Sequence, residues 1–191
     1  MYRIRLRPSY TSPELAEIYK HPHDSRRWED HKIRVRQTVS LGKEAYVQRD
    51  GLIADLSCGN ATIPVQLSVH FGARTILGDF APTSMYELRG PIERTLHMMG
   101  QTANLFILSE TLEHLDDPDT VLQMIRQKSA QLLLSTPIGE STSGNPEHYW
   151  GWDQEAVGAM LDAARWKPIM RTDLIFSNPD FCYNYQIWLC R

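Results

Sequence analysis

Four residues in the second half of the sequence have types and spacing that suit chemistry. Glu110, Glu113 and His114 are spaced i, i+3 and i+4, so on a helix they share one face. His148 follows on a later loop that can reach the same place. Carboxylates and imidazoles can hold a divalent metal, and a single imidazole can remove a proton. The sequence therefore offers two alternatives, a metal set of all four residues or His148 as a base without a metal.

A second group of residues is typical of nucleoside binding. The turn Ser57-Cys58-Gly59-Asn60 follows the apolar run 52–56, and Asp79 ends the next apolar run, 20 residues beyond Gly59. A carboxylate at that point can accept hydrogen bonds from ribose hydroxyls. The turn has one glycine where a dinucleotide fingerprint has three, which leaves little provision for a pyrophosphate. This argues against a nucleotide-dependent dehydrogenase.

The segments that must position these residues alternate between strand and helix patterns after residue 50. Apolar runs predict strands over residues 52–56, 75–79, 105–108, 131–135, 169–176 and 181–189. Helices are predicted over residues 117–129 and after Asp153, and Pro137 is expected to end the strand before it. The turn signal Asn178-Pro179-Asp180 predicts that the last two strands are antiparallel. This order is typical of an α/β fold with a mostly parallel sheet.

Two helical stretches are predicted before this core. Ser12-Pro13-Glu14 is a helix start that leads to about Lys20. From Trp28 onward, apolar residues recur at helical spacing. Residues 1 to 43 carry ten Lys or Arg against five Asp or Glu, whereas the rest carries ten against eighteen. This basic front segment is either a solvated helical face or a patch for an anionic substrate or phosphate backbone.

Composition sets the class of protein. The chain has 191 residues, 42% of them hydrophobic, and a net charge of −3, which suits one compact domain. The sequence contains no apolar run long enough to cross a membrane and no signal-peptide pattern, and its three cysteines form no CxxC motif. We expect a cytoplasmic protein without a membrane partner.

Four motifs, in order and at suitable separations, resemble those of class I S-adenosylmethionine-dependent methyltransferases, in particular the small type 11/23-like members. They are Asp55-Leu56-Ser57-Cys58-Gly59-Asn60-Ala61, Gly78-Asp79-Phe80, Leu108-Ser109-Glu110-Thr111-Leu112-Glu113-His114-Leu115-Asp116-Asp117-Pro118 and Leu134-Ser135-Thr136-Pro137. The resemblance runs from about residue 50 to residue 191. Ser57 and Ala61 stand where the family's first motif, D-x-G-C-G-x-G, has glycine.

The resemblance implies a Rossmann-like three-layer αβα sandwich, with a mostly parallel seven-stranded sheet and an antiparallel last strand. It implies S-adenosyl-L-methionine as cofactor, held by Asp55, Ser57, Cys58, Gly59, Asp79, Phe80, Ile92, Ser109 and Glu110. Ile92 belongs to Gly90-Pro91-Ile92-Glu93, the best match to the adenine-side motif. That match lies so soon after Asp79 that we expect a shortened second helix or a rudimentary third strand. Residues 49–191 would form the cofactor-binding core of a single domain, and residues 1–48 a helical substrate or lid segment.

The function implied is transfer of a methyl group to a small-molecule or terminal hydroxyl, with His148, Glu110 and His114 as catalytic candidates. An acceptor would attack the sulfonium methyl in line, helped by positioning and exclusion of water. Where N-methyltransferases of nucleic-acid bases have Asn-Pro-Pro-Tyr, this chain has Ser109-Glu110-Thr111-Leu112, which disfavours that chemistry.

Two alternatives remain. Glu110, Glu113, His114 and His148 resemble the divalent-metal set of small-RNA 2′-O-methyltransferases, and part of the set in ubiquinone-pathway O-methyltransferases. A metal-assisted RNA 2′-O-methyltransferase is therefore the first alternative, although the same Glu-x-x-Glu-His in members without metal only starts a helix. The second is a non-catalytic binding or scaffold protein on this fold, motivated by the altered glycines and Pro91.

Overall fold

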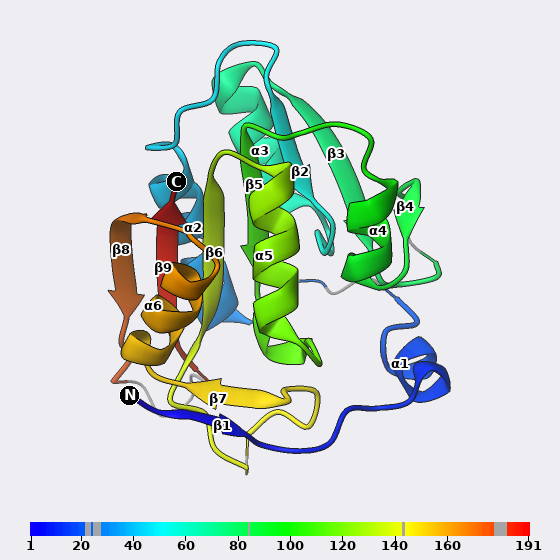
Figure 1. The fold of residues 1–191 in the computed structure, drawn as a ribbon, viewed down its shortest axis with the longest axis vertical. Coiled ribbons are helices and arrows are strands. Elements are labelled where there is room, and N and C mark those ends of the chain that lie inside the picture. The colour runs from blue at the N-terminus through cyan, green and yellow to red at the C-terminus, as the bar shows by residue number, and fades with distance from the viewer. Residues whose placement is uncertain (22–23, 25–27, 84, 143, 178–182) are drawn as a thin grey trace.

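A seven-stranded sheet forms the centre of the protein, whose computed structural model describes residues 1–21, 24, 28–83, 85–142, 144–177 and 183–191 (Figure 1). In spatial order the strands are β4 (Leu88–Arg89), β3 (Arg74–Asp79), β2 (Leu52–Asp55), β5 (Leu105–Ser109), β6 (Leu132–Ile138), β9 (Asn184–Cys190) and β8 (Pro168–Leu174). β9 is antiparallel to both of its neighbours, and the other pairs are parallel. The predicted mostly parallel sheet with an antiparallel last strand is confirmed.

Helices cover both faces of the sheet, which makes three layers (Figure 1). One face is covered by α4 (Ile92–Met98), α5 (Pro118–Lys128) and α6 (Gln154–Ala163), and the other by α2 (Glu29–Gly42) and α3 (Thr62–Phe71). Asp117 and Asp153 begin α5 and α6 by accepting hydrogen bonds from the amides of Thr120 (3.0 Å) and Ala156 (2.8 Å). These side chains satisfy amides that the first turn of a helix leaves unpaired.

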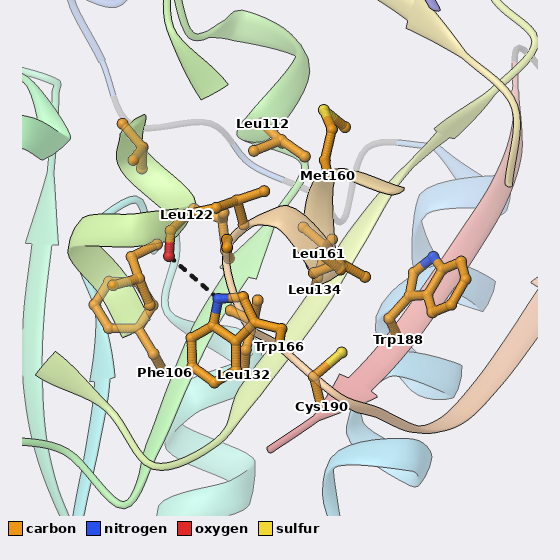
Figure 2. Packing of buried hydrophobic residues seen from close by; sticks show 14 of the residues in the cluster. Phe106, Leu112, Leu122, Leu132, Leu134, Met160, Leu161, Trp166, Trp188 and Cys190 are labelled. Atoms are coloured by element: carbon orange, nitrogen blue, oxygen red, sulfur yellow. Dashed lines mark hydrogen bonds between the residues drawn. The ribbon is translucent and has the colours of Figure 1, made fainter. Parts of the chain in front are cut away.

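The core lies on both faces of the sheet because its central strands are apolar on both sides. Along β5, Phe106 and Leu108 pack toward α4, α5 and α6, whereas Leu105 and Ile107 pack toward α2 and α3. The alternation follows from the two-residue period of a strand. Figure 2 shows the first of these clusters, in which the buried indole of Trp166 donates a hydrogen bond to the Leu122 carbonyl (3.2 Å).

The connection from β3 to β4 is unusually short. Residues 80–83 and 85–87, which are the described residues between the two strands, contain no helix, and β4 has two residues. Of the two expected alternatives, a shortened second helix or a rudimentary third strand, the structure shows the rudimentary strand, and the described part of the connection has no helix. Gly78 stands where β3 meets β4, and a Cβ there would lie 2.7 Å from the Leu88 carbonyl oxygen. A side chain at this position would force the two strands apart.

The N-terminal segment contains a strand that the sequence did not predict. β1 (Arg3–Arg5) pairs antiparallel with β7 (Trp150–Trp152), so the first residues run along the loop that follows β6 (Figure 1). Each strand has three residues and its partner lies far away in sequence, which leaves no local periodicity to detect. The two predicted helices, α1 (Ser12–Ile18) and α2, are present, and α1 has no buried residues.

β6 is longer than predicted. It runs through Pro137 to Ile138, whereas the proline in the sequence predicts an end at Pro137. β5 pairs with β6 only as far as Ser135, so beyond that residue the missing N–H of proline removes no hydrogen bond on the β5 side. The predicted turn at residues 178–180 lies outside the described residues. In the part of the chain that the structure describes, none of the helices is long and apolar enough to span a membrane.

Candidate functional site

A cavity of about 560 Å³ lies at the carboxyl ends of β2, β3 and β5. Ligands of open parallel sheets bind at this edge, because the loops that follow the strands meet there. All the residues predicted to hold a cofactor line the cavity, namely Asp55, Ser57, Cys58, Gly59, Asp79, Phe80, Ile92, Ser109 and Glu110. His114 and His148 line it as well. The structure thus brings the nucleoside-binding pattern and the histidines to one place.

Asp79 holds the turn that follows β2. Its Oδ2 accepts a hydrogen bond from the Gly59 amide (2.7 Å), and its Oδ1 accepts one from the Ala81 amide (2.9 Å). Each carboxylate oxygen can accept a further bond, so ribose hydroxyls can bind without displacing these amides. Asp79 therefore has two roles, since it shapes the turn and offers acceptors to a ligand.

The two altered positions of the first motif differ in backbone conformation. Ala61 has a φ of 55°, in the left-handed region that favours glycine, whereas Ser57 is not among the residues with positive φ. A non-glycine residue in this conformation costs about 1–2 kcal/mol. A serine in place of glycine therefore causes no backbone strain at position 57, whereas the alanine at position 61 does.

Asp55 lies beneath the turn with 3% of its surface exposed. Its Oδ1 accepts a hydrogen bond from the Ser57 amide (3.1 Å), and burial raises its pKa to about 8. A cationic ligand in the cavity would favour the ionised form of this carboxyl. Burial also raises the pKa of the neighbouring Cys58 thiol, which argues for a packing role and against a nucleophile.

The Glu-x-x-Glu-His segment is not an α-helix, which corrects the sequence prediction. A 3-10 turn, η1, covers only Leu112–His114, and α5 begins later at Pro118. Glu110 precedes η1 with a φ of 51°, so it shares no helical face with Glu113 and His114. Left-handed strain at a non-glycine residue is concentrated at functional sites in proteins.

Glu113, His114 and His148 nevertheless come together. Their potential ligand atoms lie within 4.8 Å of one another, and Glu110 is not a member of this group. The Oε2 atom of Glu113 accepts a hydrogen bond from Thr136 (2.9 Å), and its buried Oε1 has no hydrogen-bond partner among the described residues. Burial and the neighbouring Glu110 raise the pKa of Glu113 well above its ordinary value. Three of the four predicted metal candidates thus meet, and Glu110 stays apart.

The Nδ1 atom of His114 is held on the side away from Glu113. It lies 3.0 Å from the Glu147 carbonyl oxygen and 2.9 Å from the Tyr19 hydroxyl. A carbonyl can only accept, so Nδ1 carries the proton and Nε2 keeps its lone pair. That Nε2 lies 3.9 Å from Oε1 of Glu113.

His148 is held by a buried carboxyl that the sequence analysis missed. Its Nδ1 forms a short hydrogen bond with Oε2 of Glu140, and Asn145 donates from its side-chain amide to Nε2 (3.2 Å). Burial lowers the pKa of His148 to about 3 and raises the pKa of Glu140 to about 8. Glu140 stands eight residues before His148 in an irregular loop, so no helical or strand period connects them.

Arg34 is a second functional candidate that sequence patterns did not single out. It comes from α2 with 3% of its surface exposed, and its Nη1 donates to the hydroxyls of Ser109 (2.5 Å) and Ser135 (3.3 Å). Glu110 lies beside it and accepts a hydrogen bond from Ser135 (3.0 Å). Burial raises the pKa of Glu110 to about 7, even though Arg34 acts in the opposite direction.

The arginines of the first residues contact acids on the body. Arg3 donates two hydrogen bonds to the Asp119 carboxylate (3.0 and 2.5 Å), and Arg5 pairs with Asp116 (2.5 Å). Both guanidinium groups also stack on the Trp150 ring, at 4.8 and 5.0 Å. The charges of these two arginines are therefore compensated, which weakens the interpretation of this stretch as a patch for phosphates.

The architecture can be compared with that of proteins of known structure. Neither a family model nor a curated protein matches the sequence. Among solved structures, the 1,6-didemethyltoxoflavin-N1-methyltransferase of Burkholderia thailandensis, with bound S-adenosylhomocysteine, is 15% identical with a TM-score of 0.69 over 99% of this chain and 94% of its own. The magnesium protoporphyrin IX methyltransferase of Synechocystis PCC 6803, with bound S-adenosylmethionine, is 13% identical with a TM-score of 0.62 over 84% and 78%.

The protein has the class I methyltransferase fold. The [4+2]-cyclase SpnF has the same fold, at 10% identity and a TM-score of 0.71 over 96% of both chains. Proteins with this fold thus include a cyclase as well as methyltransferases. The fold alone therefore does not decide the reaction, which has to be argued from the side chains.

Proposed function

We propose that the protein is an S-adenosylmethionine-dependent methyltransferase that transfers the methyl group to a hydroxyl oxygen of a small-molecule or terminal acceptor. The observation that carries this proposal is one continuous cavity, which joins the Asp79-ordered turn to the His148–Glu140 pair. The first part suits the nucleoside of the cofactor. The second part suits an acceptor whose proton has to be removed.

The cofactor would lie across the carboxyl ends of the strands. In the proposed arrangement, Asp79 binds the ribose hydroxyls and the buried Ile92 side chain packs on the adenine. Ionised Asp55 would face the cationic half of the molecule. Ser57 is fixed nearby, since its hydroxyl accepts a hydrogen bond from Thr111 (2.8 Å), which ties the turn to the end of β5.

The transfer requires a base when the acceptor is a hydroxyl. The acceptor oxygen attacks the methyl carbon, the carbon–sulfur bond breaks, and its electron pair returns to sulfur. The hydroxyl proton would pass to Nε2 of His148, which carries no proton when Nδ1 donates to Glu140. The acceptor would first replace the Asn145 amide, which donates to this nitrogen (3.2 Å). Glu140 would be ionised above its pKa of about 8, and the carboxylate would then stabilise the imidazolium that forms, so the pair would act as one base.

A divalent metal is the second candidate for lowering the hydroxyl pKa. Glu113, His114 and His148 would hold it, because the Nδ1 atoms of both histidines are engaged by oxygen atoms, as is usual for metal-ligating imidazoles. At His148 the metal would take the place of the Asn145 amide on Nε2. The unpartnered Glu113 Oε1 is a suitable carboxylate ligand. Bound there, a metal would act as a Lewis acid on the acceptor oxygen.

A metal-assisted RNA 2′-O-methyltransferase remains the alternative acceptor class. The metal group favours it, whereas the pairing of Arg3 and Arg5 with body acids removes part of the basic surface it would need. A non-catalytic role is the remaining alternative, supported by the strained Ala61. The first residues up to 48 are proposed to cover the acceptor end, since Tyr10, Leu15 and Tyr19 line the cavity.

Calorimetry with S-adenosylmethionine and S-adenosylhomocysteine tests the proposed cofactor. We expect both to bind at micromolar to low millimolar concentration. If neither binds at millimolar concentration, the methyltransferase proposal is wrong. If both bind but a broad acceptor screen yields no S-adenosylhomocysteine above the rate without acceptor, the non-catalytic alternative is favoured.

The choice between base and metal can be made with the same protein. Titration of Mn²⁺ or Zn²⁺ into the chelator-treated protein should show one site if the metal alternative holds, and Glu113→Gln should abolish it. The matched control is Glu155→Gln, a carboxylate on the exposed start of α6. Transfer activity that persists in excess chelator would leave His148 and Glu140 as the base.

A further inference from the structure

Arg34 has hydrogen-bonding capacity that the described part of the chain leaves unused. Its side chain is 4% exposed, and its buried Nε has no hydrogen-bond partner among the described residues. The closest carboxylate oxygen, Oε1 of Glu110, lies 3.9 Å from Nε, beyond hydrogen-bond distance. Toward the described residues, only Nη1 donates, to Ser109 and Ser135. A buried guanidinium with open donors is costly unless a ligand completes its bonding.

The position of Arg34 relative to the cavity identifies what can reach it. Arg34 lines the cavity and is bonded to Ser109, the last residue of β5. β5 is the neighbour of β2, whose turn carries Ser57, and β3 with Asp79 lies on the far side of β2. A cofactor whose ribose binds Asp79 and which extends across the β2 turn therefore brings its amino-acid end to β5. Adjacent strands are about 4.8 Å apart, so this distance suits a methionine side chain.

Charge provides an independent argument. Acidic residues outnumber Arg and Lys in the described lining of the cavity: Asp55, Asp79, Glu93, Glu110, Asp116 and Glu147. Arg34 is the one Arg or Lys among those lining residues. S-adenosylmethionine has a cationic sulfonium, a cationic ammonium and a single anionic group, the α-carboxylate. A site with one guanidinium among acids is complementary to that distribution.

We propose that Arg34 binds the α-carboxylate of the methionine half of the cofactor. The inference rests on the proposed function, since it requires that the cavity bind S-adenosylmethionine. Ser109 and Ser135 hold Nη1 and thereby aim the remaining donors of the guanidinium at the ligand. A planar guanidinium can then make two hydrogen bonds to one carboxylate.

Truncated ligands test the proposal on the intact chain. Calorimetry would compare S-adenosylhomocysteine, its decarboxylated analogue, which keeps the amine, and 5′-methylthioadenosine, which lacks the amino-acid part. In the unaltered protein we expect the decarboxylated analogue to bind about 10- to 100-fold more weakly than S-adenosylhomocysteine. Arg34→Gln should weaken S-adenosylhomocysteine by a similar factor and leave 5′-methylthioadenosine within about threefold. The affinity of Arg34→Lys for S-adenosylhomocysteine should lie between those of the unaltered protein and Arg34→Gln.

Arg36→Gln is the matched control. Arg36 lies on the same helix, is mostly exposed and pairs with Glu29 (3.6 Å), so its loss should change no affinity. An equal loss for all three ligands in Arg34→Gln would assign Arg34 to pocket structure and overturn the proposal. Unchanged affinity for S-adenosylhomocysteine would overturn it as well and would point to the acceptor as the partner of Arg34.

Two further outcomes are separable. If Arg34→Gln does not fold, the ligand comparison in the unaltered protein decides, because equal binding of S-adenosylhomocysteine and its decarboxylated analogue contradicts a carboxylate contact. If the unaltered protein binds none of the three ligands, the proposed function fails and the inference fails with it.

Discussion

The two ends of the cavity are built in different ways. The cofactor end, formed by residues 55–61, Asp79 and Ile92, comes from consecutive parts of the chain, and its main hydrogen bond spans 20 residues. The acceptor end, formed by Glu113, His114, Glu140 and His148 with Tyr19, joins an N-terminal residue to a short turn and an irregular loop. Because its parts are close in sequence, the proposed cofactor end can be predicted from sequence motifs. The acceptor end depends on distant segments and can vary independently.

The largest effect is expected when Asp79 is replaced by Ala. This change removes the acceptors for the Gly59 and Ala81 amides together with the proposed ribose contact, so the Kd for S-adenosylhomocysteine should rise about 100-fold or more. His148→Gln, at the other end, should leave that Kd within about threefold. Calorimetry measures both. If the two variants lose affinity equally, the two ends are not separable.

The pH dependence of cofactor binding is expected to come from Asp55. Its pKa of about 8 means that the carboxyl is protonated in the free protein at neutral pH, and a cationic cofactor favours the ionised form. Binding must therefore release a proton below pH 8, and the affinity for S-adenosylmethionine should increase by about tenfold per unit from pH 6 to pH 8. Titration calorimetry at several pH values checks this. Asp55→Asn should flatten the profile, and a steep profile in that variant would refute the assignment.

A smaller effect is expected at the N-terminal strand beside the acceptor end. Arg3→Ala removes the ion pair with Asp119 and the contact with the Trp150 ring, and should lower the free energy of unfolding by about 1 kcal/mol. Thermal unfolding would detect this as a decrease in Tm of about 2–4 °C. Arg36→Ala, which removes an exposed pair with Glu29, should stay within about 0.5 kcal/mol. Equal decreases in the free energy of unfolding for the two variants would mean that the contacts of Arg3 add no stability to the N-terminal strand.

The smallest effect concerns the strained turn of the cofactor end. Ala61→Gly relieves a positive φ, although it adds freedom to the unfolded chain and removes a buried methyl group. The net gain in the free energy of unfolding should be about 0.5 kcal/mol, measured by denaturant titration. A loss of stability would show that the methyl packing outweighs the strain. Ala45→Gly, at a buried alanine without positive φ, provides the contrast and should destabilise.

The sheet and the cofactor end could be predicted because their signals are local. Buried parallel strands are continuous apolar runs, and the turn before Thr62 and the acid at Asp79 have fixed places relative to them. The β1–β7 pair could not be predicted, since its register joins Arg3 to Trp152 and no periodicity connects them. The end of β6 at Pro137 was predicted wrongly for another reason. Whether a proline can stand in β6 depends on where the neighbouring strand β5 ends, which the sequence of β6 does not show.

For the acceptor end, the sequence predicts which residues take part but not how they are arranged. The sequence supplied Glu113, His114 and His148 as candidates, but their helical spacing placed Glu110 with them, whereas the backbone at Glu110 turns left-handed. Glu140 and Arg34 could not be found from sequence, because no sequence period links either residue to its partner. Glu140 bonds His148 across an irregular loop, and Arg34 on α2 bonds Ser109 at the end of β5. Side chains whose role depends on tertiary contacts leave no pattern of their own.

Gly151 on β7 restricts which substitutions can be used to redesign the acceptor specificity. A Cβ at this position would lie 2.6 Å from the carbonyl oxygen of Glu140, the residue whose carboxyl holds His148. Saturation libraries should therefore tolerate almost nothing at position 151, although it contributes no side chain to the cavity. Diversity is better placed at Tyr10 and Tyr149, which line the acceptor end. A position that contributes no side chain to the cavity can thus limit how far the acceptor end can be redesigned.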